Sequence, residues 1–240
     1  MSTNKHSTTT AISTITPWFS NDSIDHVSFG HTVTATIERD LDEHEHLFLE
    51  GEDQTHVYLV VEGVVGLYKL LADGRRQIST FAYPGDIIGL DSIGVHGNSG
   101  EALSHAVVRC IPVNAIEKLI RSEPGFGQAL LYLTASELAE TREQMLSLGR
   151  KSAAEKVATF LIRISRRSVA MGQTGSLLSI PMKRSEIADF LGLTIETVSR
   201  TFTKLKVARV IRLRSNSQVE VLEMEKLSGI AEGNSTNVIH

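Results

Sequence analysis

The feature that most constrains the fold is the regular spacing of four glycines in the first half of the chain. Gly51, Gly63, Gly74 and Gly85 follow one another at intervals of 12, 11 and 11 residues. Short runs rich in Val, Ile, Leu, Phe and Tyr lie around them, at 46–49, 57–61, 64–71, 77–81, 87–90 and 106–111. Short apolar runs separated by turn residues are typical of an antiparallel barrel or a jelly roll. We therefore expect residues 17–122 to form such a β domain.

The pattern then changes to one of helices. Pro124 offers a helix start, and no proline follows before Pro181. A seam with spacings of 3, 4, 3, 4 and 3 runs through Leu131, Thr134, Leu138, Thr141, Met145 and Leu148. A stripe of two positions per heptad favours a helix over 123–150 that pairs with its twin in a dimer. The same helix could also pack on its own β domain. A second helix is expected over 152–169.

The segment 184–206 has the pattern of a helix-turn-helix. Such a motif needs a small residue where the helices approach, a glycine in the turn and an apolar contact from the second helix. Ala188, Gly192 and Val198 supply these at offsets of 4 and 6 residues, and Thr194 is a suitable N-cap for the second helix. The remaining inward positions are Ile187, Leu191, Phe202 and Leu205. The runs 207–213 and 219–222 then indicate a two-stranded wing.

With those apolar residues inside, Glu196, Ser199 and Arg200 point outward near the start of the second helix, the part that enters the major groove of DNA. Arginine can bind guanine O6 and N7 together, and glutamate can accept from cytosine N4. A second group is expected to contact the DNA backbone: Lys183, Arg184, Thr194, Thr197, Lys204, Lys206 and Arg212.

The charge distribution supports a polyanionic partner for the second half. Residues 1–149 carry 9 Lys and Arg against 20 Asp and Glu, a net charge of −11, whereas residues 150–240 carry 15 against 8, a net charge of +7. The chain has no apolar run long enough to span a bilayer and no secretory leader, which predicts a cytoplasmic protein without a membrane partner. Residues 1–16 and 226–240 are expected to be tails flanking the β domain, the helix and a winged domain at 151–225.

These segments together resemble the CRP/FNR superfamily of transcription regulators, nearest its FNR and FixK branch. The resemblance covers about residues 30–225 and rests on Phe48-Leu49-Glu50-Gly51-Glu52, on Pro84-Gly85-Asp86-Ile87-Ile88-Gly89-Leu90 and on Ile195-Glu196-Thr197-Val198-Ser199-Arg200. It implies an α+β protein: an N-terminal β jelly-roll (double-stranded β-helix) sensor domain, a long dimerisation helix and a C-terminal winged helix-turn-helix. It also implies a homodimer that reads a TTGAT-N4-ATCAA-like palindrome of double-stranded DNA through Glu196, Ser199 and Arg200. In one departure, Lys183 stands where the branch commonly has Ser or Thr opening the first helix of the motif.

The resemblance further implies an activator that touches RNA polymerase through exposed loops, with residues 72–76 as one candidate. Residues 77–108 contain no Lys or Arg, so the cation that binds a cyclic phosphate in this superfamily is absent. Cys110 is the single cysteine, which cannot hold the branch's iron–sulfur cluster. We therefore expect no cofactor, and interpret Cys110 as a small core residue. Two modes of control stay open: abundance set by an oxygen- or nitrogen-oxide-sensing circuit, or a small organic effector of unknown identity.

One alternative function comes from a different class. His44, His46 and Glu50 form His-x-His-x3-Glu, part of the metal motif of cupin-type metal-dependent enzymes. The glycines that frame this motif are replaced by Glu38 and Val57. Because no other catalytic arrangement is recognisable, we expect that the protein is not an enzyme.

Overall fold

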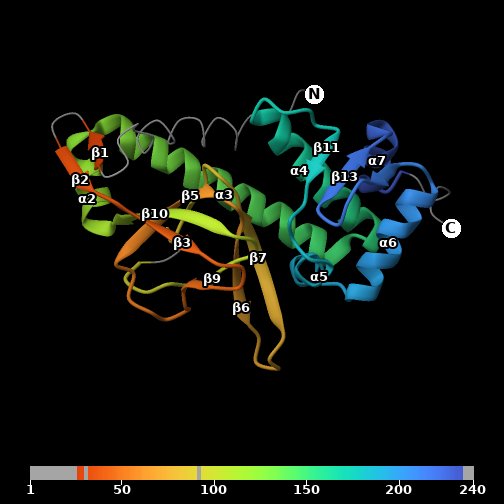
Figure 1. Cartoon of the computed structure of the whole chain (residues 1–240), viewed down its shortest axis with the longest axis horizontal. Coiled ribbons are helices and arrows are strands. Elements are labelled where there is room, and N and C mark those ends of the chain that lie inside the picture. Colours follow the sequence, from red (N-terminus) through yellow and green to blue (C-terminus); the bar gives the residue numbers. More distant parts are fainter. Residues whose placement is uncertain (1–25, 30–31, 91–92, 235–240) are drawn as a thin grey trace. The chain divides into compact units, whose positions relative to one another are not determined.

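The computed structural model describes residues 26–29, 32–90 and 93–234, and the predicted tail at 1–16 lies outside them. The described residues form two compact units, divided between Glu140 and Thr141 inside one long helix. Figure 1 shows strands of the first unit followed by helices and short strands of the second. The predicted α+β class is confirmed.

Two four-stranded antiparallel sheets build the first unit. One has the order β3(Ile37–Leu41), β10(Ala106–Pro112), β5(His56–Glu62), β8(Ile87–Ile88); the other has the order β4(His46–Phe48), β9(Ser99–Ala102), β6(Val65–Leu70), β7(Arg76–Ala82). Strands β1(His26–Phe29) and β2(Thr32–Ala35) pair with each other. The predicted turn glycines Gly51, Gly63, Gly74 and Gly85 all have positive φ, the conformation that glycine adopts without strain.

The first unit has two apolar clusters, one on each face of β5. Tyr58 and Val60 face a core filled from strands of both sheets, whereas Val57 and Leu59 face a core shared with two helices. Alternate residues of a strand point to opposite faces, so a strand covered on both faces is apolar throughout. This explains the continuous run 57–60, whereas Val61 at its end is 40% exposed.

The helices that cover the outer face of this sheet are α2(Val113–Ser122) and α3(Pro124–Arg150). Phe126, Ala129 and Leu133 of α3 are buried in the second cluster. The helix start at Pro124 was predicted, but α2 was not. Strands β1, β2, β3 and β9 were not predicted either.

The second unit contains α4(Ala153–Ala170), α5(Arg184–Leu191), α6(Ile195–Val207) and α7(Met224–Ala231), with a sheet of order β11(Leu177–Ser179), β13(Gln218–Val221), β12(Ile211–Leu213). The predicted wing is present, although 207 belongs to α6 and β11 adds a third strand. The prediction of a tail at 226–240 is wrong for residues 226–231, which belong to α7. Leu227 and Ile230 are buried there, and α7 packs against α4, because this short segment has its own apolar face.

Candidate nucleic-acid interface

The turn between α5 and α6 has the predicted geometry. Gly192 ends α5 in the left-handed conformation, with φ of 59° and ψ of 46°, and the Leu193 amide donates to the Ala188 carbonyl over 3.0 Å. Thr194 caps α6, its hydroxyl accepting from the Thr197 amide at 3.2 Å. Each predicted residue of the turn therefore has the backbone role expected from its type.

The inner face of the motif is closed by apolar side chains. All the predicted inward residues are buried: Ile187, Ala188, Leu191, Val198, Phe202 and Leu205. Arg184 joins them from the edge. Its guanidinium carbon lies 3.7 Å from the centroid of the Phe202 ring, and burial lowers the pKa of Arg184. We predicted Arg184 as a backbone contact, but the structure holds it half-buried between the two helices.

Lys183 stands at the N-cap of α5 without a capping oxygen, but the helix start is satisfied in another way. Glu186, three residues later and buried, accepts from the Lys183 amide at 2.6 Å. A carboxylate in the first turn also interacts favourably with the helix dipole. The Lys183 side chain remains exposed.

The outer face of α6 presents the predicted base-reading residues together. Glu196, Ser199 and Arg200 are all exposed, and the Arg200 Nε donates to the Glu196 carbonyl at 3.3 Å. Hydrogen bonds from its own backbone amide and from Thr194 hold the pKa of Glu196 below its usual 4.5, so the carboxylate is ionised at neutral pH. Sequence reasoning missed Ile195, whose side chain is 48% exposed on the same first turn. An apolar residue directly after the cap was the available signal.

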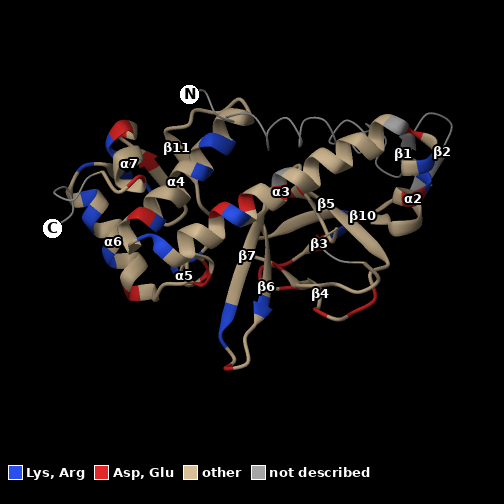
Figure 2. Cartoon of the chain, turned by 180° about the vertical axis from the view of Figure 1, so that it is seen from behind, with Lys and Arg blue, Asp and Glu red and all other residues tan. Residues whose placement is uncertain are grey.

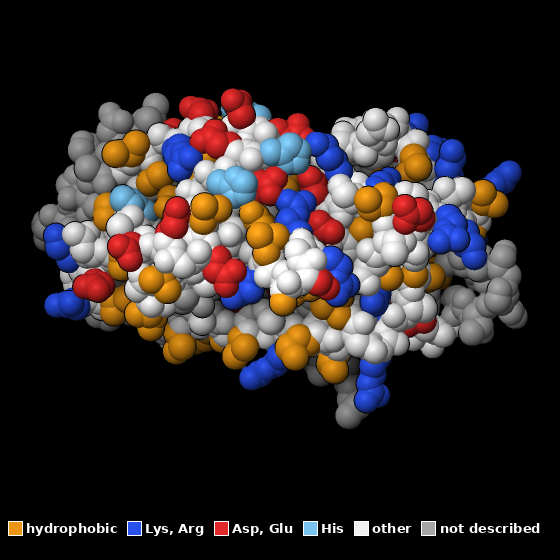
Figure 3. Space-filling view, turned by 90° about the horizontal axis from the view of Figure 1, so that it is seen from below, with side chains coloured by type: hydrophobic (Ala, Val, Ile, Leu, Met, Phe, Trp, Pro, Cys, Tyr) orange, Lys and Arg blue, Asp and Glu red, His pale blue; other side chains and the backbone are white. Residues whose placement is uncertain are grey.

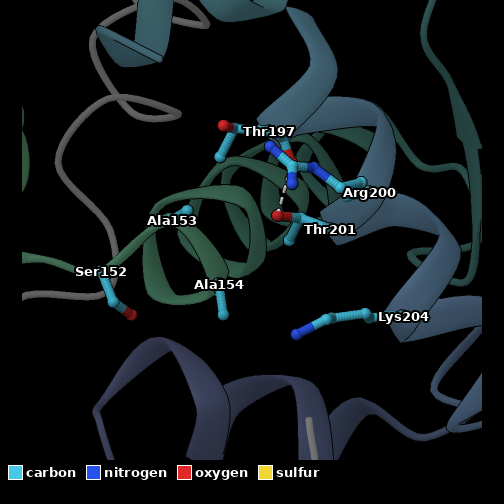
Figure 4. Close-up of a pocket in the computed structure, with 7 residues that line it drawn as sticks. All are labelled: Ser152, Ala153, Ala154, Thr197, Arg200, Thr201 and Lys204. Carbon is cyan, nitrogen blue, oxygen red and sulfur yellow. Dashed lines mark hydrogen bonds between the residues drawn. The ribbon is translucent and has the colours of Figure 1, made fainter. Parts of the chain in front are cut away.

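A hollow of 330 Å³ lies beside α6, between it and the start of α4 (Figure 4). Arg200 and Lys204 line it from α6, and Ser152, the N-cap of α4, lines it from the other side. The backbone amides of a helix's first turn carry partial positive charge. Two cationic side chains and a helix N-terminus therefore surround a space suited to an anion.

The remaining predicted backbone contacts divide into two groups. Thr194, Lys204 and Lys206 are exposed, and Thr197 is half-buried. Arg212, in contrast, is held in the wing by an ion pair with Glu220 at 3.0 Å. Figure 2 shows Lys and Arg predominating on α4 and α6.

The first unit does not assemble the three side chains of the alternative metal site. His44 Nδ1 lies 2.6 Å from Glu101, His46 Nε2 lies 2.8 Å from the Tyr68 hydroxyl, and Glu50 pairs with Lys69 at 2.7 Å. Within the part of the chain that the structure describes, no group of three or more His, Cys, Asp and Glu residues could hold a metal ion. Figure 3 shows histidines of this unit interspersed with acidic and basic side chains on its surface.

The interior of the first unit is filled with aromatic rings beside strand β9. Phe48 stacks on His96 with 3.9 Å between centroids, and a Cβ added at Gly100 would lie 3.0 Å from the Phe48 ring. A larger side chain at position 100 would therefore displace Phe48. Cys110 is half-buried against the same core, and burial raises the pKa of its thiol.

The predicted dimer seam on α3 is largely exposed. Leu131, Leu138 and Met145 are 68%, 51% and 68% exposed, and Thr134 and Thr141 are exposed beside them. Leu148 differs, since it is half-buried and its methyl would lie 3.3 Å from a Cβ at Gly192. None of the helices in the described ranges is long and apolar enough to cross a membrane.

Comparisons with known proteins match both units. Residues 38–123 match the cyclic nucleotide-binding domain family and residues 155–230 match the Crp-like helix-turn-helix domain family. The nitrogen fixation regulation protein FixK of Bradyrhizobium diazoefficiens is 44% identical over 162 residues, 68% of each chain. The transcriptional activatory protein AadR of Rhodopseudomonas palustris is 40% identical over 78% of each chain. The structure of FixK2 from Bradyrhizobium japonicum superposes with a TM-score of 0.77 at 36% identity, covering 82% of this chain and 98% of that one.

Proposed function

Because this chain belongs to the FixK branch of the CRP/FNR superfamily of transcription regulators, we propose that it binds a TTGAT-N4-ATCAA-like palindrome as a homodimer and activates transcription there. The chain is a DNA-binding transcription regulator and not an enzyme. The alternative of a cupin-type metal-dependent enzyme is therefore wrong, and His44, His46 and Glu50 have the separate partners described above. The observation that carries the proposal is the joint exposure of Glu196, Ser199 and Arg200 on the first turns of α6.

Each of these side chains has a matching base edge in the proposed half-site. Arg200 donates to guanine O6 and N7, and the ionised Glu196 accepts from the N4 amine of the opposing cytosine. Ser199 supports either contact. Ile195 adds an apolar surface of the kind that packs against a thymine methyl group, such as that of the thymine preceding the guanine in TTGAT.

We infer that a backbone phosphate binds in the hollow between α4 and α6, next to the base-reading residues of α6. Lys204 and the N-terminus of α4 supply positive charge, whereas the Ser152 hydroxyl already donates to Glu155 Oε1 at 2.8 Å. Phosphate contacts fix the register of a protein on the duplex without reading sequence. We expect Lys183 and Lys206, both exposed, to act in the same way.

The exposed seam of α3 supports the homodimer. Burying a leucine side chain contributes about 1.5–3 kcal/mol, and Leu131, Leu138 and Met145 leave such surface uncovered in one protomer. A two-fold dimer would place two copies of α6 about 34 Å apart, which matches half-sites one helical turn apart.

The regulatory setting follows from the relatives. Their names include nitrogen fixation regulation, transcriptional activation and anaerobic regulation, which supports an activator in an oxygen- or nitrogen-oxide-responsive circuit. Leu70 and Leu71, 64% and 42% exposed near the tip of the β6–β7 hairpin, extend the candidate surface at 72–76 for RNA polymerase. The absence of Lys and Arg from residues 77–108 supports DNA binding without a cyclic nucleotide.

The experiment that tests the proposal measures binding of the purified protein, without added ligand, to the TTGAT-N4-ATCAA duplex at fixed salt. We expect tight binding that is lost in Arg200→Ala and on a duplex whose guanines are changed. The matched control is Lys204→Ala on the same helix, which is expected to weaken binding to the two duplexes by the same factor. Equal affinity of the wild-type protein for both duplexes would overturn the proposed half-site.

A further inference from the structure

The wing contains a three-residue charge cluster that the base-reading surface does not involve. Glu220 lies on β13, and its residue partner across the sheet is Arg212 on β12. One carboxylate oxygen of Glu220, Oε2, lies 3.0 Å from Arg212 Nη1 and 2.8 Å from Arg214 Nη2. Both cations of this part of the wing are thus held on a single oxygen atom.

The anchor and the cations differ in their freedom to move. Glu220 stands on the middle strand of the sheet, paired with β11 on one side and β12 on the other, and its side chain is 25% exposed. Arg212 lies on an edge strand and Arg214 in the turn that follows it, with side chains 52% and 49% exposed. The carboxylate is therefore the fixed member, and the guanidinium groups are the ones that can reach out.

Arginines in the wing of such a domain are suited to DNA phosphates, and a carboxylate competes for the same donors. The hydrogen bond from Arg214 holds the pKa of Glu220 below its usual range, so the competitor is charged at neutral pH. An arginine already neutralised by a carboxylate contributes less to the release of counterions from DNA than one that is unpaired.

We propose that Glu220 is a positioning residue that restrains sequence-blind DNA affinity by holding Arg212 and Arg214 away from backbone phosphates. The inference rests on DNA binding by this unit. In this view the wing limits the affinity for DNA of unrelated sequence. Recognition of the correct site then depends more on α6 than on the wing.

The test compares Glu220→Gln with Glu225→Gln on an unrelated duplex over a salt series. Glu225 is an exposed carboxylate of α7 in the same unit, so its substitution changes the net charge equally and leaves the wing intact. We expect Glu220→Gln to steepen the slope of log affinity against log salt by about one, and to raise affinity roughly tenfold near 0.1 M salt. Glu225→Gln should leave the slope unchanged.

A slope for Glu220→Gln equal to that of Glu225→Gln would overturn the proposal, and so would weaker binding than wild type. Should Glu220→Gln fail to fold by circular dichroism, Arg212→Gln and Arg214→Gln give the same information in the wild-type background. Each is expected to lower the slope by clearly less than the value of about 0.9 for a full phosphate contact, and a full loss would overturn the restraint. Failure of wild type and Glu225→Gln alike to bind any duplex would instead overturn DNA binding itself.

Discussion

The guanidinium of Arg184, on the first helix of the motif, stacks 3.7 Å from the centroid of the Phe202 ring on the second. A partly desolvated cation over a ring contributes about 1 kcal/mol. We therefore expect Arg184→Gln to lower the free energy of unfolding by about that amount, measured by urea denaturation. Lys183→Gln, one residue earlier but exposed, is the matched control and should leave stability within error. A stability loss shared by both variants would contradict a specific role for the stacking.

The turn of the motif requires a residue that tolerates positive φ. Gly192→Ala places a Cβ at φ of 59° and 3.3 Å from a Leu148 methyl, so we expect it to cost about 1–2 kcal/mol of stability. Gly149→Ala is the opposite case, because Gly149 is helical and nothing lies within 4 Å of the added atom. It should stabilise the protein by about 0.5–1 kcal/mol. The Tm of the two variants should shift in opposite directions. Shifts of the same sign would refute the left-handed conformation of Gly192 or the helical one of Gly149.

The exposed seam of α3 predicts a change in oligomeric state. Leu138→Glu puts a charge at the centre of the seam in both protomers, where it would be desolvated beside its copy, and we expect a monomer at micromolar concentration. Leu146→Glu is the control, since Leu146 is 65% exposed but lies off the seam. Sedimentation equilibrium distinguishes them. A dimer that survives Leu138→Glu but not Leu146→Glu would place the interface on another face of α3.

The lowered pKa of Glu196 predicts how specificity depends on pH. A carboxylate whose pKa in the folded protein is depressed stays ionised as pH falls, and is protonated only below the usual 4.5. Discrimination for cytosine should therefore be constant between about pH 5 and 8, the range above an ordinary glutamate pKa. Competition between the palindrome and a duplex in which the guanine–cytosine pair is exchanged for another measures this discrimination. Glu196→Gln should lose the discrimination at every pH, and a wild-type decline near pH 6 would contradict the role of an ionised Glu196.

The sequence predicted the recognition motif almost residue by residue, because its geometry is local. Small, turn and apolar positions there are set by contacts within 23 residues, and each of Ala188, Gly192 and Val198 has the expected environment. The alternation of glycines and apolar runs likewise located most strands of the first unit.

The elements that were missed depend on distant partners. Ser99–Ala102 carries little β propensity, yet it is a strand because β4 and β6 flank it and Gly100 packs under Phe48. In α7, eight residues give too short a pattern to predict a helix, and its burial depends on α4. Side-chain pairings were equally out of reach: nothing in the local sequence assigns Arg184 to Phe202 or Arg212 to Glu220.

Within the second unit, the last turns of α3 contact the helix-turn-helix motif directly. The Gln144 side chain donates to the Phe190 carbonyl at 3.1 Å, and Leu148 sits over Gly192. The stretch that would meet its twin across a two-fold axis therefore also grips the end of the first motif helix. The distance between the two recognition helices of a dimer would then depend on these side-chain contacts, because no flexible linker separates the dimer helix from the motif. A substitution that removes the Gln144 hydrogen bond would therefore widen the range of half-site spacings that the protein accepts.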